Sequence, residues 1–202
     1  MLSPPPPPRP SIGLALQRRA LLPLIAAGLG SWPSFAAEPE RAPSAVLDLQ
    51  GYLPPSDLDR LDRILTKLEA DTGFKVRVLT QSRETAPEMG PVLQRWRVGD
   101  GGRLRDPNAV LMVADRGLRG KLEQAGGSFI RYEVGDNVRV RVPDSYWGRL
   151  QREYAKIDFI QKRGEAAAII TSCELIISCL RNDDFSDPSI CTDVPKAGES
   201  FF

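Results

Sequence analysis

The sequence predicts a single α/β domain, a three-layer sandwich in which helices cover both faces of a central sheet. Three observations lead to this prediction. Apolar residues recur at helical spacing between positions 56 and 72, a segment that alternates in polarity follows directly, and a continuous apolar run occupies Ala109–Ala114. Pro107 and Asp115 bound that run, and its length suits a strand that is buried on both faces.

The helix that ends at position 72 has the clearest signals of any element. The segment Pro54–Ser56 ends a short strand at Val46–Leu49 and supplies a helix N-cap at Ser56. One face of the helix is apolar and the opposite face is charged: Leu58, Leu61, Ile64, Leu65 and Leu68 against Asp57, Arg60, Arg63 and Lys67. Gly73 then ends the helix, because glycine readily adopts the left-handed conformation that follows many helices.

The later elements continue the alternation of strands and helices. They are a strand at Phe74–Thr80, a short helix that starts between Pro87 and Pro91 and ends near Trp96, the strand at Ala109–Ala114, strands at Phe129–Val134 and Val138–Val142 joined by a hairpin at 135–137, a helix with Pro143 at its first position, and a last helix over about 164–180. The helix after Pro143 carries an aromatic stripe that is expected to pack in the core or, alternatively, to dock a partner: Tyr146, Trp147 and Tyr154. Residues 182–202 are predicted to be a flexible C-terminal tail.

Residues 1–36 are predicted to be a cleavable targeting leader. No acidic residue precedes Glu38, and Arg18 and Arg19 stand directly before the uncharged run Ala20–Ala37. The arginine pair resembles a twin-arginine export signal, and the general secretory route is the alternative. Small residues near the end of the run place the cleavage after Ala36 or one residue later.

The leader predicts that the mature chain is exported from the compartment in which it is made. If the proline-rich segment Met1–Gln17 is an organellar transit segment, the destination is a thylakoid lumen; otherwise it is a bacterial periplasm or a cyanobacterial lumen. A membrane anchor is the other interpretation of the apolar run. Its most hydrophobic part, Ala20–Leu29, is nearer the length of a signal peptide, so we expect no stable membrane span after processing.

The composition excludes several kinds of chemistry. The chain has no histidine among its 202 residues, which excludes the Ser-His-Asp triad, Cys-His nucleophile pairs and histidine zinc sites. Removing the leader takes away three of the 27 Lys and Arg residues and none of the 26 Asp and Glu residues, which leaves a net charge of −2. Such a chain has no long-range attraction for phosphate backbones, so we expect no nucleic-acid partner.

The three cysteines predict one disulfide. Cys173 and Cys179 lie on different sides of the last helix and cannot bridge each other without unwinding it. Cys173 shares the apolar stripe of that helix and is predicted to be a buried thiol. Cys179, at the end of the helix, can pair with Cys191 and hold the tail.

Three aspartates near strand ends raise the question of a metal site. Asp48, Asp100 and Asp106 could gather at one edge of the sheet and hold Ca²⁺ or Mg²⁺. Alternatively, each is a turn or strand-end residue that bonds to local backbone, and this is the interpretation we adopt. The prediction is therefore no catalytic residue, no metal and no cofactor, with Asp48 and Asp106 as the alternative metal pair.

Several segments resemble the TPM-domain family, in particular its thylakoid-lumenal branch. They are Val46–Pro54, Asp71–Gly73, Val76–Leu79, Trp96–Gly99, Val134-Gly135, Val142–Leu150 and Ser178–Arg181, and the resemblance spans about residues 45–181. It implies a Rossmann-like mixed sheet with flanking helices. For some members it also implies a role in photosystem II repair or an acid phosphatase activity.

The phosphatase-like members carry acidic residues and an Asn-Gly pair near the buried strand, in places associated with a divalent cation. Asp48, Asp106 and Asn108 are in comparable positions, but Ala109 stands where the glycine would be. The expected function is therefore that of a non-enzymatic auxiliary, assembly or repair factor for a photosynthetic membrane complex in the thylakoid lumen. The alternatives are a metal-assisted acid phosphatase that uses Asp48 and Asp106, and a redox-responsive protein that works through Cys179 and Cys191.

Overall fold

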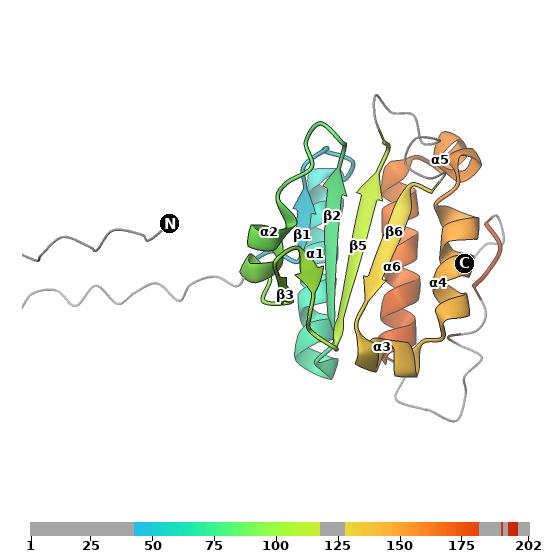
Figure 1. The fold of residues 1–202 in the computed structure, drawn as a ribbon. Helices are drawn as coiled ribbons and strands as arrows, with labels where there is room; N and C mark the ends of the chain where they lie inside the picture. Colours follow the sequence, from blue (N-terminus) through green and yellow to red (C-terminus); the bar gives the residue numbers. More distant parts are fainter. Residues whose placement is uncertain (1–42, 118–127, 182–190, 192–193, 198–202) are drawn as a thin grey trace, which may run out of the picture. The chain divides into compact units, whose positions relative to one another are not determined.

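The structure is a computed structural model, which describes residues 43–117, 128–181, 191 and 194–197 (Figure 1). The predicted leader, residues 1–36, and its cleavage position lie outside these ranges. The elements are β1 (Val46–Asp48), α1 (Pro55–Thr72), β2 (Lys75–Gln81), α2 (Met89–Arg95), β3 (Gly99–Asp100), β4 (Arg103–Leu104), β5 (Ala109–Asp115), β6 (Ile130–Val134), α3 (Asp136–Arg141), α4 (Asp144–Tyr154), α5 (Ile157–Arg163) and α6 (Glu165–Arg181).

The central sheet is mixed and has the strand order β1-β2-β5-β6. β1, β2 and β5 run parallel, and β6 runs antiparallel to β5. β2 and β5 pair along their whole lengths, from Lys75 opposite Ala109 to Gln81 opposite Asp115. β3 and β4 form a separate small hairpin.

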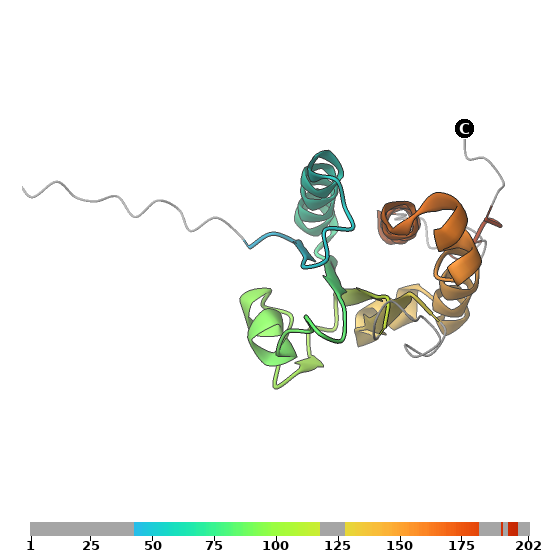
Figure 2. The same cartoon turned by 90° about the horizontal axis from the view of Figure 1, so that it is seen from above.

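Helices cover both faces of the sheet, as predicted. Figure 2 shows α1 and α6 on one side of the sheet and α2 on the other. Val110 and Met112 on β5 join the apolar cluster under α1, α4 and α6, whereas Leu111 and Val113 join a second cluster with Leu93 of α2. Because alternate residues of β5 face two apolar layers, all of them are buried and the strand reads as one continuous apolar run.

Helix α1 begins two residues earlier than the predicted N-cap at Ser56 allows. Pro54 occupies the N-cap position and Pro55 is the first helical residue, so the prediction of an N-cap at Ser56 is wrong. Proline suits this position, because the first backbone N–H groups of a helix have no partner within the helix. The predicted end is confirmed, since Gly73 has a φ of 76° and its N–H donates a 2.9 Å hydrogen bond to the carbonyl oxygen of Glu69.

The strand predicted at Val138–Val142 is wrong, because these residues belong to or directly follow α3. Val138 and Val142 are buried, whereas Val140 between them is 87% exposed. In a strand all three would share one face, whereas a helix brings residues four apart together. Gly135 makes the turn possible, since its N–H donates a 2.8 Å hydrogen bond to the carbonyl oxygen of Ala109 and leads the chain over the start of β5.

Some elements gave no signal that the sequence analysis used. α5 has seven residues, and β3 and β4 have two residues each, so their periodicity is too short to detect. Part of the segment predicted as a flexible tail is also described. Cys191 is buried in the main core cluster, and residues 194–197 contact α4.

Candidate functional site

The carboxyl ends of the three parallel strands meet at one edge of the sheet, where ligands bind in many α/β proteins. We call this the carboxyl edge; it comprises Asp48, Thr80, Gln81 and Asp115 with Tyr52 and Arg131 beside them. The Asp48 carboxylate accepts hydrogen bonds from the backbone N–H groups of Tyr52 (3.2 Å) and Leu53 (2.9 Å) and from the Thr80 hydroxyl. Both of its oxygens are thus engaged in holding the loop between β1 and α1.

Asp115 is the second carboxylate of this edge and is only 8% exposed. One of its oxygens accepts a 2.7 Å hydrogen bond from the N–H of Gly117. The other accepts from Gln81 Nε2 at 3.2 Å and from the Arg131 guanidinium at 3.4 Å. The Asp115 carboxylate thus has a cation and two further hydrogen-bond donors, which is the arrangement expected of a structural ion pair.

Tyr52 lies in the same electrostatic environment. Burial raises the pKa of Tyr52 to about 12, with further increases from the carboxylates of Glu165, Asp115 and Asp48 and an opposing effect from Arg116. Arg116 itself pairs with Glu165 at 3.0 Å. The phenol therefore remains protonated at neutral and acidic pH and does not supply a phenolate nucleophile.

Asp106 lies at the opposite edge of the sheet, before the first residue of β5. Its carboxylate pairs with Lys75 Nζ at 2.7 Å and accepts a 2.9 Å hydrogen bond from the N–H of Asn108. Asp48, by contrast, is level with the end of β2, because it pairs with Thr80. The structure therefore does not bring the alternative metal pair, Asp48 and Asp106, together. Parallel strand order separates them, and spacing along the sequence could not reveal this.

The third aspartate of that hypothesis, Asp100, also lies away from Asp48. It belongs to the β3–β4 hairpin and forms an exposed ion pair with Arg105 at 3.2 Å. In the ranges that the structure describes, no three Asp, Glu, Cys or His side chains cluster as metal ligands. Ca²⁺ and Mg²⁺ need several available oxygen ligands, and the oxygens of Asp48 and Asp106 are already hydrogen-bonded within the protein. The residues present do not fit a divalent cation shared between them.

The sequence analysis missed Gln81, Asp115 and Arg131 as members of the carboxyl edge. Asp115 was used only to mark the end of the apolar run Ala109–Ala114. Gln81 and Asp115 are the last residues of β2 and β5, and Arg131 is the second residue of β6, which runs antiparallel to β5. The rule that such ends converge is the signal that could have found them.

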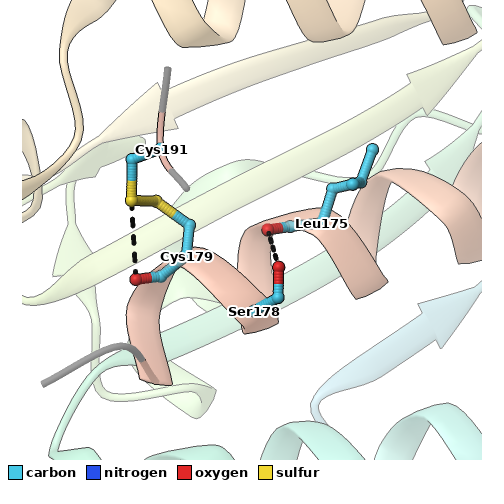
Figure 3. The surroundings of a disulfide bond; sticks show 4 residues. All are labelled: Leu175, Ser178, Cys179 and Cys191. Atoms are coloured by element: carbon cyan, nitrogen blue, oxygen red, sulfur yellow. Dashed lines mark hydrogen bonds between the residues drawn. A yellow bond between two sulfur atoms is a disulfide. The ribbon is translucent and has the colours of Figure 1, made fainter. Parts of the chain in front are cut away.

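Cys179 and Cys191 are joined by a disulfide bond in the structure (Figure 3). The Cα atoms are 5.2 Å apart, and the bond links the last turns of α6 to a residue that the main core cluster buries. Cys173 is a free, fully buried thiol. Burial raises the pKa of the Cys173 thiol far above its ordinary value, so it does not provide a reactive thiolate.

The aromatic stripe on α4 lies in the core, which confirms the first of its two interpretations. Tyr146, Trp147 and Tyr154 are all buried. The rings of Tyr146 and Trp147 meet edge to face at 5.7 Å, and Trp147 also packs against Tyr132 at 5.3 Å. These contacts fix α4 against β6 and leave no aromatic surface on that stripe for a partner.

Within the ranges that the structure covers, none of the helices combines the length and hydrophobicity needed to cross a bilayer. A family model described as the TPM domain matches residues 46–178. The chain is 30% identical over 147 residues to "Thylakoid lumenal 15.0 kDa protein 2, chloroplastic" of Arabidopsis thaliana, which is 71% of this chain and 59% of that protein. The chain thus spans about three fifths of the length of this relative.

A solved structure is similar in fold. It is the N-terminal domain of a protein from P. gingivalis, determined by solution NMR, with a TM-score of 0.51 at 15% sequence identity. The similarity covers 69% of this chain and 83% of that domain. At this level of identity the likeness concerns the arrangement of the elements and carries no statement about activity.

Proposed function

This chain belongs to the TPM domain family, and from that premise we propose that it acts in a thylakoid lumen as a non-enzymatic auxiliary factor. Its task would be to assist the assembly or repair of a photosynthetic membrane complex, such as photosystem II. The chain would act by binding its partner. The proposal keeps the compartment named by the Arabidopsis relative and carries it over to this chain.

Two features support the compartment. The relative is named as a thylakoid lumenal protein, and the similarity extends over 71% of this chain. The bond between Cys179 and Cys191 also suits an exported protein, because disulfides persist in oxidising compartments and are rare in the cytosol. A periplasm or a cyanobacterial lumen would offer a similar environment, and these are the alternatives.

The proposal that the chain is not an enzyme rests on the separation of Asp48 from Asp106. The two carboxylates lie at opposite edges of the sheet, and each is held by donors of the protein itself. A metal-assisted phosphatase needs a metal with open coordination positions and a nucleophile next to it. The acid phosphatase remains the alternative, and an assay can decide between the two.

The first experiment measures hydrolysis of an aryl phosphate at mildly acidic pH, with Ca²⁺ or Mg²⁺ added and with EDTA as the control. We expect no hydrolysis above that of buffer. Hydrolysis that requires the metal and is lost in both Asp48→Asn and Asp106→Asn would establish the phosphatase alternative. Calorimetric titration with Ca²⁺ should likewise give no heat of binding.

The second experiment addresses the compartment and the partner. Fractionation of cells that produce the full chain should recover the processed protein from the lumen. Crosslinking in intact thylakoids should then link it to subunits of a membrane complex. Recovery from the stroma or cytosol, or crosslinks to itself alone, would contradict the proposal.

A redox role for Cys179 and Cys191 is a separate alternative. Crosslinking is therefore repeated with and without a reductant. The auxiliary-factor proposal expects the same partners in both conditions, whereas a redox-responsive protein would change them.

A further inference from the structure

A cavity of about 390 Å³ lies between the end of α4 and α5, away from the carboxyl edge. We call it the α4–α5 cavity, and its charged lining consists of Arg152, Lys156, Lys162 and Arg163 with Glu153 and Asp158. The cationic groups outnumber the anionic groups by two to one. Its volume falls in the range of cavities that hold small ligands or peptide side chains.

The cations of this cavity have no internal partners in the described ranges. None of the four is in an ion pair there, although Arg60, Lys75 and Arg131 elsewhere are paired with carboxylates. Of the two acidic residues, Glu153 is engaged, because its carboxylate accepts a 3.3 Å hydrogen bond from the N–H of Ala197. The described lining therefore carries a net positive charge of +2, from four cations and two carboxylates.

Two of the residues that line the cavity, Ala197 and Phe159, belong to segments that contact Tyr154 of α4. Ala197 lines it, and the segment that carries Ala197 is tied down twice: by the hydrogen bond from Tyr154 to the Pro195 carbonyl oxygen and by the disulfide at Cys191. Phe159, which also lines it, packs edge to face against Tyr154 at 5.2 Å. Lining residues that are already held by such contacts lose less conformational entropy on binding than free ones do.

We propose that the α4–α5 cavity binds an acidic peptide segment of a partner protein. Carboxylate side chains match the two arginines, which bind them through two parallel hydrogen bonds, and the two lysines add positive charge. The backbone of an extended peptide can lie against Phe159. This inference rests on the proposed function as a binding protein, and it names the surface that makes the contact.

The shape of the site favours a peptide over a membrane surface. Helices that bind anionic lipids commonly insert exposed apolar side chains beside their basic residues. Phe159, which lines the concave site, is instead half-buried and packs against Tyr154, and Ile157 is the one apolar residue of α5 that is exposed, at 37%. A protruding acidic segment can enter such a site, whereas a bilayer cannot.

The test uses the full chain and a short fluorescein-labelled peptide of alternating glutamate and glycine, followed by fluorescence anisotropy. The substitutions Lys162→Gln and Arg163→Gln together should weaken binding about tenfold, because each exposed ion pair contributes a few-fold in affinity. The matched control is Arg63→Gln with Arg103→Gln, which neutralises two exposed cations on other elements. Circular dichroism checks that both variants are folded.

The outcomes separate this inference from the proposed function. It is supported if the control binds like the unchanged protein, if added salt weakens binding, and if a lysine-glycine peptide does not bind. It is overturned if the glutamate peptide does not bind, if both variants lose affinity equally, or if phosphatidylglycerol vesicles bind and displace the peptide. If the peptide does not bind but the chain still crosslinks to a membrane complex, this inference fails and the proposed function stands. If the chain has phosphatase activity, the proposed function fails, whether or not the peptide binds.

Discussion

The hydroxyl group of Tyr154, at the end of α4, donates a 2.8 Å hydrogen bond to the backbone carbonyl oxygen of Pro195. The two residues are 41 positions apart in the sequence. Tyr154 is buried, so its phenol needs a partner, and the C-terminal segment supplies one. The helical layer and the segment after α6 are therefore one packed unit at this point.

The first prediction removes this donor. Tyr154→Phe keeps the ring and its packing on Phe159 but leaves the Pro195 carbonyl oxygen without the phenol, which should cost about 1 kcal/mol of unfolding free energy. Urea unfolding followed by circular dichroism measures this cost. The matched control is Tyr132→Phe, because among the described residues the buried Tyr132 hydroxyl makes no hydrogen bond of ordinary geometry and has the Ser172 hydroxyl as a polar neighbour. Equal losses in the two variants would contradict the role of the Pro195 contact.

The second prediction concerns the disulfide. Cys179 and Cys191 are 12 positions apart, and closing a loop of about that size stabilises a protein by about 3 kcal/mol in the chain-entropy model. Cys191→Ser, or reduction of the unchanged protein, should lower the melting temperature accordingly. The control is Cys173→Ala, which should remain sensitive to the reductant because it retains the bond.

A thiol count checks the same bond directly. The chain has three cysteines, and Cys173 is the free one. Denatured but unreduced protein should therefore react with one equivalent of a thiol reagent. Reaction with three equivalents would show that the bond does not form.

The third prediction treats Asp48 as a structural residue. Asp48→Asn retains one acceptor oxygen for the N–H groups of Tyr52 and Leu53 but loses the other, which should cost about 1–3 kcal/mol. Asp100→Asn is the control, because its ion pair with Arg105 is exposed and worth at most about 1 kcal/mol. Thermal unfolding compares the two. An unchanged melting temperature for Asp48→Asn would contradict the structural role of this carboxylate.

Local patterns of apolar residues predicted most of this fold, because each pattern reflects which face of a single helix or strand is buried. Leu61, Leu65 and Leu68 are buried on α1 as their spacing indicated. The run Ala109–Ala114 is a strand buried on both faces. The failure at Val138–Val142 has a physical reason as well. A three-valine alternation fits a strand, but contacts with the distant start of β5 decide for a helix, and no local pattern contains them.

The candidate site was less predictable, because it depends on which strand ends meet. Asp48 is the last residue of β1, whereas Asp106 precedes β5. Since these strands are parallel, the two positions fall at opposite edges. Asp115 would have been the better partner to consider for Asp48, since both end parallel strands. The charges of the α4–α5 cavity were missed because α5 itself was not predicted.

The fourth prediction is a loss of stability at alkaline pH. Burial raises the pKa values of Tyr132, Tyr146 and Cys173 above their ordinary values. Above the ordinary pKa the unfolded chain releases these protons while the folded chain retains them, so unfolding becomes more favourable as pH rises. The contribution of these three groups to stability should therefore be constant below about pH 8 and fall above about pH 9, where cysteine and then tyrosine ionise in the unfolded state.

Urea unfolding at a series of pH values measures this slope. Tyr132→Phe removes one of the groups and should make the decline above about pH 10 shallower. The control is Tyr52→Phe, whose pKa of about 12 is also raised but by less than that of Tyr132. If the stability of Tyr132→Phe declines with pH as steeply as that of the unchanged protein, then Tyr132 has the same pKa in the folded and unfolded states.

The fifth prediction tests the turn that converts the expected strand into α3. A Cβ atom on Gly135 would lie 2.5 Å from the Pro107 carbonyl oxygen and still closer to that of Asp106, and both are backbone atoms that cannot move aside alone. Gly135→Ala should therefore shift the start of α3 and destabilise the protein by about 1–3 kcal/mol. Gly90→Ala is the control, because its nearest neighbour is at 3.7 Å and alanine favours a helix such as α2. Urea unfolding should show a loss of stability for Gly135→Ala and none for Gly90→Ala. Unchanged stability of Gly135→Ala would mean that Gly135 does not contact the backbone of residues 106–107 as described.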